Sequence, residues 1–171
     1  MNYLEKYINT GWELNMWSAG KSDGVDWNHS FWTIPEMRKA LKFFDSIAEV
    51  NQKEMVLYRG TIDNASPTMH EMAPELPSHK QKSHILSTSY SRSIADEFSN
   101  DLRKRIGYLH VLHIQPGVKM IDINKTLEAP WNKREEEVLL LPGYKLILKG
   151  VKPIAFKDTY VSRWEFEWVV Y

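Results

Sequence analysis

The chain has 171 residues, and its 22 Lys and Arg residues balance 22 Asp and Glu residues, so the formal net charge is zero. A hydrophobic share of 43% and a charged share of 26% are typical of a globular domain and exclude a disordered, collagen-like or coiled-coil chain. The neutral balance gives no support for nucleic-acid binding by bulk electrostatics, although it leaves a local basic patch open, and the lack of Cys excludes disulfides and thiolate chemistry. Without a linker or an internal repeat, we expect one domain over residues 1–171.

Targeting signals are missing from the sequence. No basic segment followed by an apolar segment begins the chain, so we expect no signal peptide. The longest continuous aliphatic run, residues 138–141, is far shorter than the ~20 residues that a membrane-spanning helix needs. These features predict a cytoplasmic protein that does not contact a membrane.

The first predicted elements are helices. Residues 1–17 place apolar side chains at helical spacing, and residues 18–31 are typical of a loop. Thr33 and Glu36 form a capping-box sequence that predicts the start of a second helix. Its apolar face is expected to contain Ile34, Met37, Leu41, Phe44 and Ala48.

Strands dominate the rest of the chain. We predict a strand over residues 55–58 that ends at Arg59-Gly60, a loop over 61–83 and a strand over 85–89. Ser91 or Ser93 is then expected to cap a helix that buries Ile94, Ala95, Phe98 and Leu102. Further strands are predicted at 108–114, 118–123, 137–141, 144–148, 151–156 and 161–171, with turn signals that include Gly150. Helices followed by short strands, without β-α-β alternation, favour an α+β fold with antiparallel or mixed sheets.

Common catalytic motifs are absent. The sequence contains no HExxH metal motif, no phosphate-binding glycine loop of the usual kinds and no GxSxG nucleophile elbow. His110 and His113 lie three apart in a predicted strand, so they point to opposite faces and are interpreted as structural.

Three short motifs contain side chains that could bind a ligand or take part in catalysis. Arg59-Gly60 joins a guanidinium that can fork onto a phosphate or carboxylate to a glycine that lets a ligand approach the backbone. A Ser-Thr-Ser triplet at 87–89 closes the next strand, although terminal hydroxyls also commonly cap turns. Three glutamates at 135–137 lead into an apolar strand, where they are either solvated charges or a two-carboxylate site formed by Glu135 and Glu137 on one face.

In this order the three motifs resemble the R-S-E class of mono-ADP-ribosyltransferases, which contains arginine-modifying bacterial toxins and related phage enzymes. The resemblance extends from about residue 34 to the end of the chain. It implies an ADP-ribosyltransferase fold, in which two roughly perpendicular antiparallel or mixed β-sheets are flanked by N-terminal helices. It also implies NAD as the co-substrate and no requirement for a metal.

The resemblance assigns roles to individual residues. Arg59 would bind the NAD phosphates, and the backbone of Gly60 would contact the nicotinamide amide. Ser87 would orient Glu137, the catalytic glutamate that stabilises the cation formed as nicotinamide leaves. Glu135 would position and deprotonate an arginine acceptor. The NAD-binding site would further include Thr88, Ser89, Phe98 and either Arg103 or Arg105, and Trp131 would help to select the substrate.

The acceptor stays open at this point. An arginine of a target protein is the first hypothesis, and the basic stretches at 79–84 and 103–105 leave RNA or DNA as an alternative. Hydrolysis of NAD by water and a catalytically silent interaction module are two further alternatives. The resemblance to phage and toxin–antitoxin enzymes also implies an antitoxin or inhibitor partner.

Overall fold

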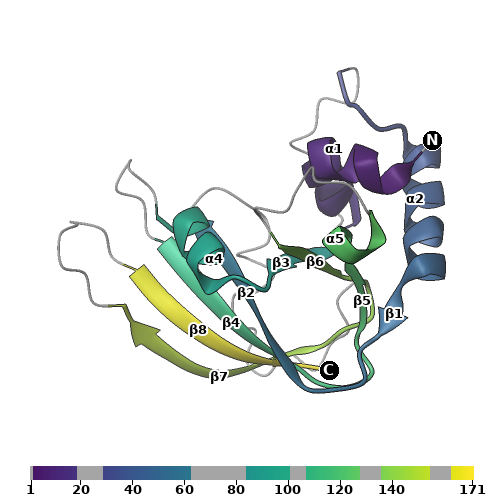
Figure 1. The fold of residues 1–171 in the computed structure, drawn as a ribbon. Coiled ribbons are helices and arrows are strands. Elements are labelled where there is room, and N and C mark those ends of the chain that lie inside the picture. The colour runs from purple at the N-terminus through teal and green to yellow at the C-terminus, as the bar shows by residue number, and fades with distance from the viewer. Residues whose placement is uncertain (1, 19–28, 63–83, 101–106, 128–135, 155–162) are drawn as a thin grey trace.

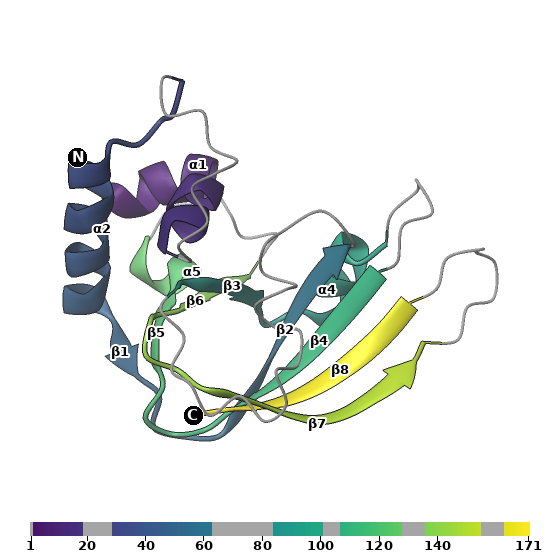
Figure 2. The same cartoon turned by 180° about the vertical axis from the view of Figure 1, so that it is seen from behind.

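The computed structural model describes residues 2–18, 29–62, 84–100, 107–127, 136–154 and 163–171. In chain order its elements are α1 (Tyr3–Ser18), α2 (Ile34–Ile47), β1 (Glu49–Val50), β2 (Met55–Ile62), β3 (Leu86–Ser89), α4 (Arg92–Phe98), β4 (Gly107–Ile114), β5 (Lys119–Asp122), α5 (Ile123–Thr126), β6 (Glu137–Leu140), β7 (Leu146–Pro153) and β8 (Arg163–Val170). Figures 1 and 2 show α1 and α2 beside one part of the sheet and α4 beside the other.

The strands form one mixed sheet in the order β1-β5-β6-β3-β2-β4-β8-β7. All neighbouring pairs are antiparallel except β4 and β8, which are parallel. Between its two halves, β1-β5-β6-β3 and β2-β4-β8-β7, the described residues give one register pair, Tyr58 with Ser89. The predicted α+β class is therefore confirmed, and hydrogen bonding joins the two expected sheets into one.

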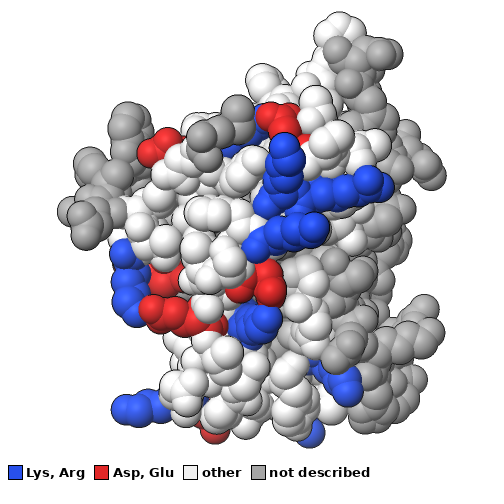
Figure 3. Space-filling model, turned by 90° about the vertical axis from the view of Figure 1, so that its right-hand side faces the viewer, with Lys and Arg blue, Asp and Glu red and all other residues white. Residues whose placement is uncertain are grey.

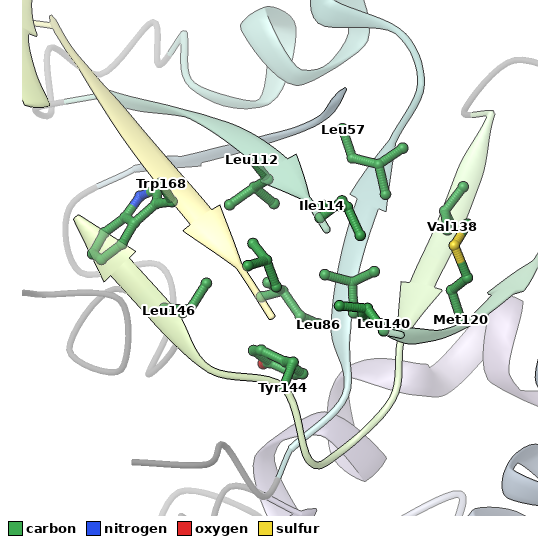
Figure 4. Packing of buried hydrophobic residues seen from close by; sticks show 12 residues of the cluster. Leu57, Leu86, Leu112, Ile114, Met120, Val138, Leu140, Tyr144, Leu146 and Trp168 are labelled. Atoms are coloured by element: carbon green, nitrogen blue, oxygen red, sulfur yellow. The ribbon is translucent and has the colours of Figure 1, made fainter. Parts of the chain in front are cut away.

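One hydrophobic core fills the concave side of this bent sheet (Figure 4). Both halves contribute to it: Leu57, Leu112 and Trp168 come from one half, and Leu86 and Leu140 come from the other. Because side chains alternate along a strand, the opposite faces of these strands remain to be covered by helices.

A second core joins α1 and α2 to the β1-β5-β6-β3 half of the sheet. Helix α1 is kinked at Thr10 (φ −144°), and the freed Thr10 carbonyl accepts a hydrogen bond from the Trp32 indole at 3.1 Å. The Glu13 carboxylate is buried, and it accepts hydrogen bonds from the backbone amides of Phe31 and Trp32 at 3.2 Å. These contacts lock the segment that enters α2 against α1.

The predicted start of α2 is confirmed, since the Thr33 and Glu36 side chains form both bonds of the capping box. The predicted apolar face is partly wrong. Met37, Ala40 and Phe44 are buried, whereas Ile34 at the first turn is 42% exposed. Ile34 is the first residue of α2, at the end of the helix rather than in the middle turns that hold Met37, Ala40 and Phe44.

Three further predictions need correction. Strand β2 does not end at Arg59-Gly60 but continues to Ile62, because β4 pairs with it along its whole length. Gly150 is not a turn: it lies at a bulge within the single strand β7, which replaces two predicted strands. Ser91 does cap α4, but Phe98 is 57% exposed rather than buried, and Leu102 lies outside the described residues.

Across the described part of the chain, no helix combines the length and the apolar character needed to cross a bilayer.

Candidate active site

A pocket of about 240 Å³ lies where the two halves of the sheet meet. Past the register pair of Tyr58 with Ser89, strands β2 and β3 have no further described pair, and α4 forms one wall of the opening. The lining combines a cation, a carboxylate, hydroxyls and apolar groups: Tyr58, Arg59, Gly60, Ser87, Thr88, Ser89, Ile94, Ala95, Phe98 and Glu137. The pocket therefore gathers residues from all three sequence motifs.

Arg59 bridges the two halves of the sheet. From β2 its Nη1 donates a hydrogen bond of 2.6 Å to the backbone carbonyl of Ser87 in β3. This contact fixes the guanidinium at the edge of the pocket. A fixed fork of donors is suited to an anionic group such as a phosphate.

Glu137 is the carboxylate of the pocket, and it is only 8% exposed. The Ser87 hydroxyl donates to Glu137 Oε1 at 2.6 Å. Pairing of β3 with β6 sets this geometry, and a bond of 2.7 Å from the Thr88 hydroxyl to the Val138 carbonyl reinforces it. The carboxylate is thus held in one place by a neutral donor.

The backbone turns sharply just before Glu137. Glu136 has a φ of 46°, in the left-handed region that non-glycine residues rarely adopt, and its carbonyl accepts a bond from the Tyr90 amide at 3.2 Å. Because β6 begins only at Glu137, strand alternation gives no basis for placing Glu135 on the same face. Glu135 itself lies outside the described residues, as do Trp131, Arg103 and Arg105.

Gly60 is needed for packing rather than for ligand approach alone. A Cβ at this position would lie 1.8 Å from the Ala95 carbonyl oxygen of α4. The helix therefore sits directly on the backbone of β2. This contact brings Ile94, Ala95 and the exposed ring of Phe98 to the pocket.

Tyr7 of α1 approaches the site, and the motif analysis missed it. Its hydroxyl is buried and pairs with Asn15 at 3.1 Å. Burial raises the pKa of Tyr7, and the Glu137 carboxylate raises this pKa further, whereas Arg59 lowers it. In the sequence Tyr7 was one of several apolar residues at helical spacing, so no pattern distinguished it from an ordinary core residue.

His110 lies opposite Arg59 in the register of β2 and β4. Trp168 Nε1 donates to His110 Nδ1 at 3.1 Å, so the ring proton lies on Nε2, which faces the Thr61 hydroxyl at 3.2 Å. Burial, with a smaller contribution from the Arg59 charge, lowers the pKa of His110 to about 3. Its burial and its two side-chain partners agree with the structural interpretation of this residue.

Among the described residues no group of three His, Asp or Glu side chains is arranged to hold a metal ion.

Comparison with known proteins gives no match to a family model and none to a curated sequence. Solved structures do match. The toxin Plx2a from Paenibacillus larvae, an ADP-ribosyltransferase, has a TM-score of 0.65 and 18% identity over 99% of this chain and 84% of its own. BECa, the ADP-ribosylating toxin of a binary enterotoxin of C. perfringens, solved with NADH, has a TM-score of 0.69 and 13% identity over 99% of this chain and 42% of its own, so this chain spans less than half of BECa. The Vibrio splendidus ADP-ribosyltransferase Vis, solved with agmatine, has a TM-score of 0.62 and 16% identity over 99% of this chain and 72% of its own. The chain therefore has the ADP-ribosyltransferase fold, which these bacterial toxins share.

Proposed function

We propose that this protein is a mono-ADP-ribosyltransferase that cleaves NAD, releases nicotinamide and transfers ADP-ribose to arginine side chains of a target protein. The observation that carries the proposal is the hydrogen bond of 2.6 Å from Ser87 to Glu137, in a pocket that also holds Arg59. A buried carboxylate costs stability unless it is paired and hydrogen-bonded, so the burial of Glu137 beside Ser87 and Arg59 favours a functional role for this carboxylate.

The pocket suits part of a dinucleotide. Its volume of about 240 Å³ is suited to one ring with its sugar rather than to all of NAD. Arg59 offers a cation for the phosphates, and the exposed ring of Phe98 offers an apolar face for a planar base. The complex of the structurally similar BECa with NADH supports a nicotinamide dinucleotide as the ligand.

The proposed reaction depends on a positive charge that develops on the ribose of NAD and is then neutralised by the acceptor. The bond between the nicotinamide nitrogen and ribose C1′ breaks, nicotinamide leaves with the electron pair, and positive charge builds on the ribose. Glu137, held by Ser87, stabilises that charge electrostatically. A guanidinium nitrogen of the acceptor then bonds to C1′ and loses a proton, for which we propose Glu135 as the base.

Arginine is the proposed acceptor because Glu135 would supply a second carboxylate beside Glu137. A guanidinium has a pKa above about 12, so a carboxylate that orients and deprotonates it removes the main obstacle to attack. The complex of Vis with agmatine, a guanidinium compound, supports a guanidinium acceptor on this fold. Trp131 is proposed to help to choose the target.

The test uses labelled NAD and a bacterial lysate, with free nicotinamide measured in parallel. We expect Glu137→Gln to lower labelling and nicotinamide release by about 10²–10³-fold, the usual effect of losing one transition-state electrostatic contact. Glu136→Gln is the matched control, because the Glu136 side chain is exposed and is not among the residues that line the pocket. Equal effects of the two variants, or no nicotinamide release by the unaltered protein, would overturn the proposal.

The same assay separates the acceptors. Figure 3 shows Lys and Arg side chains gathered on the face that carries α2, where Arg38, Lys39 and Lys42 are exposed. This local basic patch keeps nucleic acid as a second candidate acceptor, although the basic stretches predicted at 79–84 and 103–105 lie outside the described residues except for His84, which is buried. Label in protein supports an arginine acceptor, label in RNA or DNA replaces it, and nicotinamide release without any labelled macromolecule indicates hydrolysis.

The cytoplasmic location and an antitoxin or inhibitor partner belong to this proposal too. Both derive from the motif resemblance, and capture of a protein from the native host with Glu137→Gln as bait is the direct test of the partner.

A further inference from the structure

Helix α4 forms a wall of the candidate active site but is too short to be stable alone. It has 7 residues, Arg92–Phe98, and isolated helices below roughly 12–15 residues are marginal in water. Of its residues, Ala95 is buried and Phe98 is largely exposed. Its position over the pocket must therefore be set by specific contacts rather than by broad apolar burial.

The C-terminal turn of α4 is bound by Arg163 of β8. Arg163 is 3% exposed, and its Nη2 donates to the Asp96 carbonyl at 3.0 Å and also to Asp96 Oδ1 and Ser99 Oγ. Ser99 is fully buried. A cation at this end also interacts favourably with the helix dipole.

The N-terminal turn of α4 is bound by the same strand. Glu165 lies two residues after Arg163, so both side chains leave the same face of β8. The Glu165 carboxylate accepts from Arg92, the first residue of α4, and from Lys152 Nζ at 3.0 Å. Strand β8 thus holds α4 at both ends.

Two glycines let the helix reach the sheet. A Cβ on Gly60 of β2 would lie 1.8 Å from the Ala95 carbonyl oxygen, and a Cβ on Gly107 of β4 would lie 1.8 Å from the Ser99 carbonyl oxygen. Backbone therefore packs directly on backbone at both places. Any side chain at Gly107 must push the C-terminal turn of α4 away from the sheet.

We propose that Arg163 and Gly107 are positioning residues for NAD binding, which they serve by holding α4 against β2 and β4. This inference rests on the proposed function. Ala95 and Phe98 of α4 line the same pocket as Arg59 and Glu137, so the position of α4 against the sheet affects the space available to the nicotinamide end of NAD. Arg163 and Gly107 act at a distance, through the helix.

If Arg163 and Gly107 had a purely structural role, substituting them would lower stability without changing the affinity of the folded protein for NAD. The design therefore compares variants that disturb α4 with variants that disturb other places. Arg163→Met removes the cation, and Arg163→Lys retains it. Gly107→Ala displaces α4, whereas Gly150→Ala is its matched control, because the nearest atom to a Cβ there is 3.9 Å away. Val170→Ala, in the core at the far end of β8, controls for lost stability.

Four quantities are measured at a temperature where every variant is folded: the Kd for carba-NAD, the KM and the kcat for nicotinamide release, and the rate of amide hydrogen exchange over residues 94–99. We expect Arg163→Met and Gly107→Ala to raise Kd and KM by about tenfold, which corresponds to a loss of about 1.4 kcal/mol of binding free energy. Exchange over residues 94–99 should accelerate in both. Arg163→Lys should recover part of the affinity, and Gly150→Ala and Val170→Ala should stay within about twofold of the unaltered protein.

The possible failures are distinct. If the unaltered protein binds carba-NAD and Arg163→Met binds it equally well, the inference is overturned while the proposed function stands. If Val170→Ala loses as much affinity as Arg163→Met, the effect is one of stability, and the inference is overturned again. If the unaltered protein neither binds the analogue nor releases nicotinamide, the proposed function fails and the role in NAD binding fails with it, whereas the exchange data still report whether Arg163 holds α4.

Discussion

The two halves of the sheet are covered in different ways. The β1-β5-β6-β3 half carries α1 and α2 on an apolar core, in which Leu14, Met37, Phe44 and Leu139 are fully buried. The β2-β4-β8-β7 half carries α4 on ion pairs, hydrogen bonds and bare glycine backbone. Figure 1 shows α1 and α2 beside the first half and α4 beside the second.

The two kinds of cover have different effects: the apolar core mainly stabilises the fold, whereas the polar contacts of α4 mainly fix the position of that helix. Apolar burial is non-directional and stabilises roughly in proportion to area, so it holds α2 firmly without fixing any one contact. Hydrogen bonds and ion pairs are directional, and they specify where α4 lies. The candidate site lies at the boundary, with Ser87 and Glu137 from the first half and Arg59 from the second. The distances from Arg59 to Ser87 and Glu137 therefore depend on how the two halves of the sheet are joined.

Loss of apolar contact in the first half should give the largest change in stability. Phe44 of α2 is fully buried and its ring contacts that of Tyr7 of α1, so we expect Phe44→Ala to lower the free energy of unfolding by about 3–5 kcal/mol. Nicotinamide release per folded molecule should not change. Denaturant unfolding and kinetics on the folded fraction measure the two effects. Phe31→Ala is the control, because Phe31 is 64% exposed and should cost less than about 0.5 kcal/mol. A large effect from Phe31 would contradict this division.

Loss of one polar contact at the boundary should act on chemistry instead. Ser87→Ala removes the donor to Glu137, and a hydrogen bond to a charged group contributes about 1.5–3 kcal/mol. We therefore expect kcat for nicotinamide release to fall by about 10–100-fold, with a loss of stability no larger than about 3 kcal/mol and smaller than that of Phe44→Ala. Because Ser87 acts through Glu137, the double variant with Glu137→Gln should be no slower than Glu137→Gln alone. Additive losses would show that Ser87 has a separate role.

The sequence predicted the elements whose rules are local. The capping box at Thr33 and Glu36, the strand that ends at Ser89 and the Ser91 cap each depend on a few adjacent residues, and all are present in the structure. The three motifs also converge on one pocket, although the roles of their residues stay predictions. The three short motifs thus predicted several of the residues that line the pocket.

What the sequence did not predict depends on neighbours far along the chain. Pairing with β4 extends β2 past Arg59-Gly60, and pairing with β8 turns Gly150 from a turn signal into a bulge. Gly60 lines the pocket, and its predicted contact with a ligand stays a prediction, but the close approach of the Ala95 carbonyl, which also requires a glycine there, was not predicted. The contact of Arg163 with α4 joins residues 67 positions apart, and no local pattern indicates it.

Acid should destabilise the second half through His110. Its pKa is about 3 when folded and about 6.5 when unfolded, so below pH 6.5 the unfolded chain binds a proton that the folded chain does not. Stability is therefore unaffected above that pH and falls as the pH drops from about 6.5 towards 3. At pH 5 the loss is about 2 kcal/mol.

The measurement is the free energy of unfolding as a function of pH, compared with His110→Gln. Glutamine retains a donor and an acceptor near Trp168 and Thr61 but does not titrate. The unaltered protein should lose about 2 kcal/mol more than this variant between pH 7 and pH 5. Parallel pH curves would mean that burial does not keep His110 neutral.

The smallest expected effect concerns the helix cap on the apolar half. Thr33→Ala removes the acceptor for the Glu36 amide, at 3.3 Å, and one side of the capping box, which typically costs about 1 kcal/mol. Thr33→Ser retains the hydroxyl and should recover most of that loss. Because α2 is held mainly by apolar contacts away from the pocket, neither variant should change the KM for NAD, even though both alter the helix that covers the sheet beside Glu137. A rise in KM with Thr33→Ala would mean that the cover of the first half also positions the site, and that the division between the two halves is not one between stability and geometry.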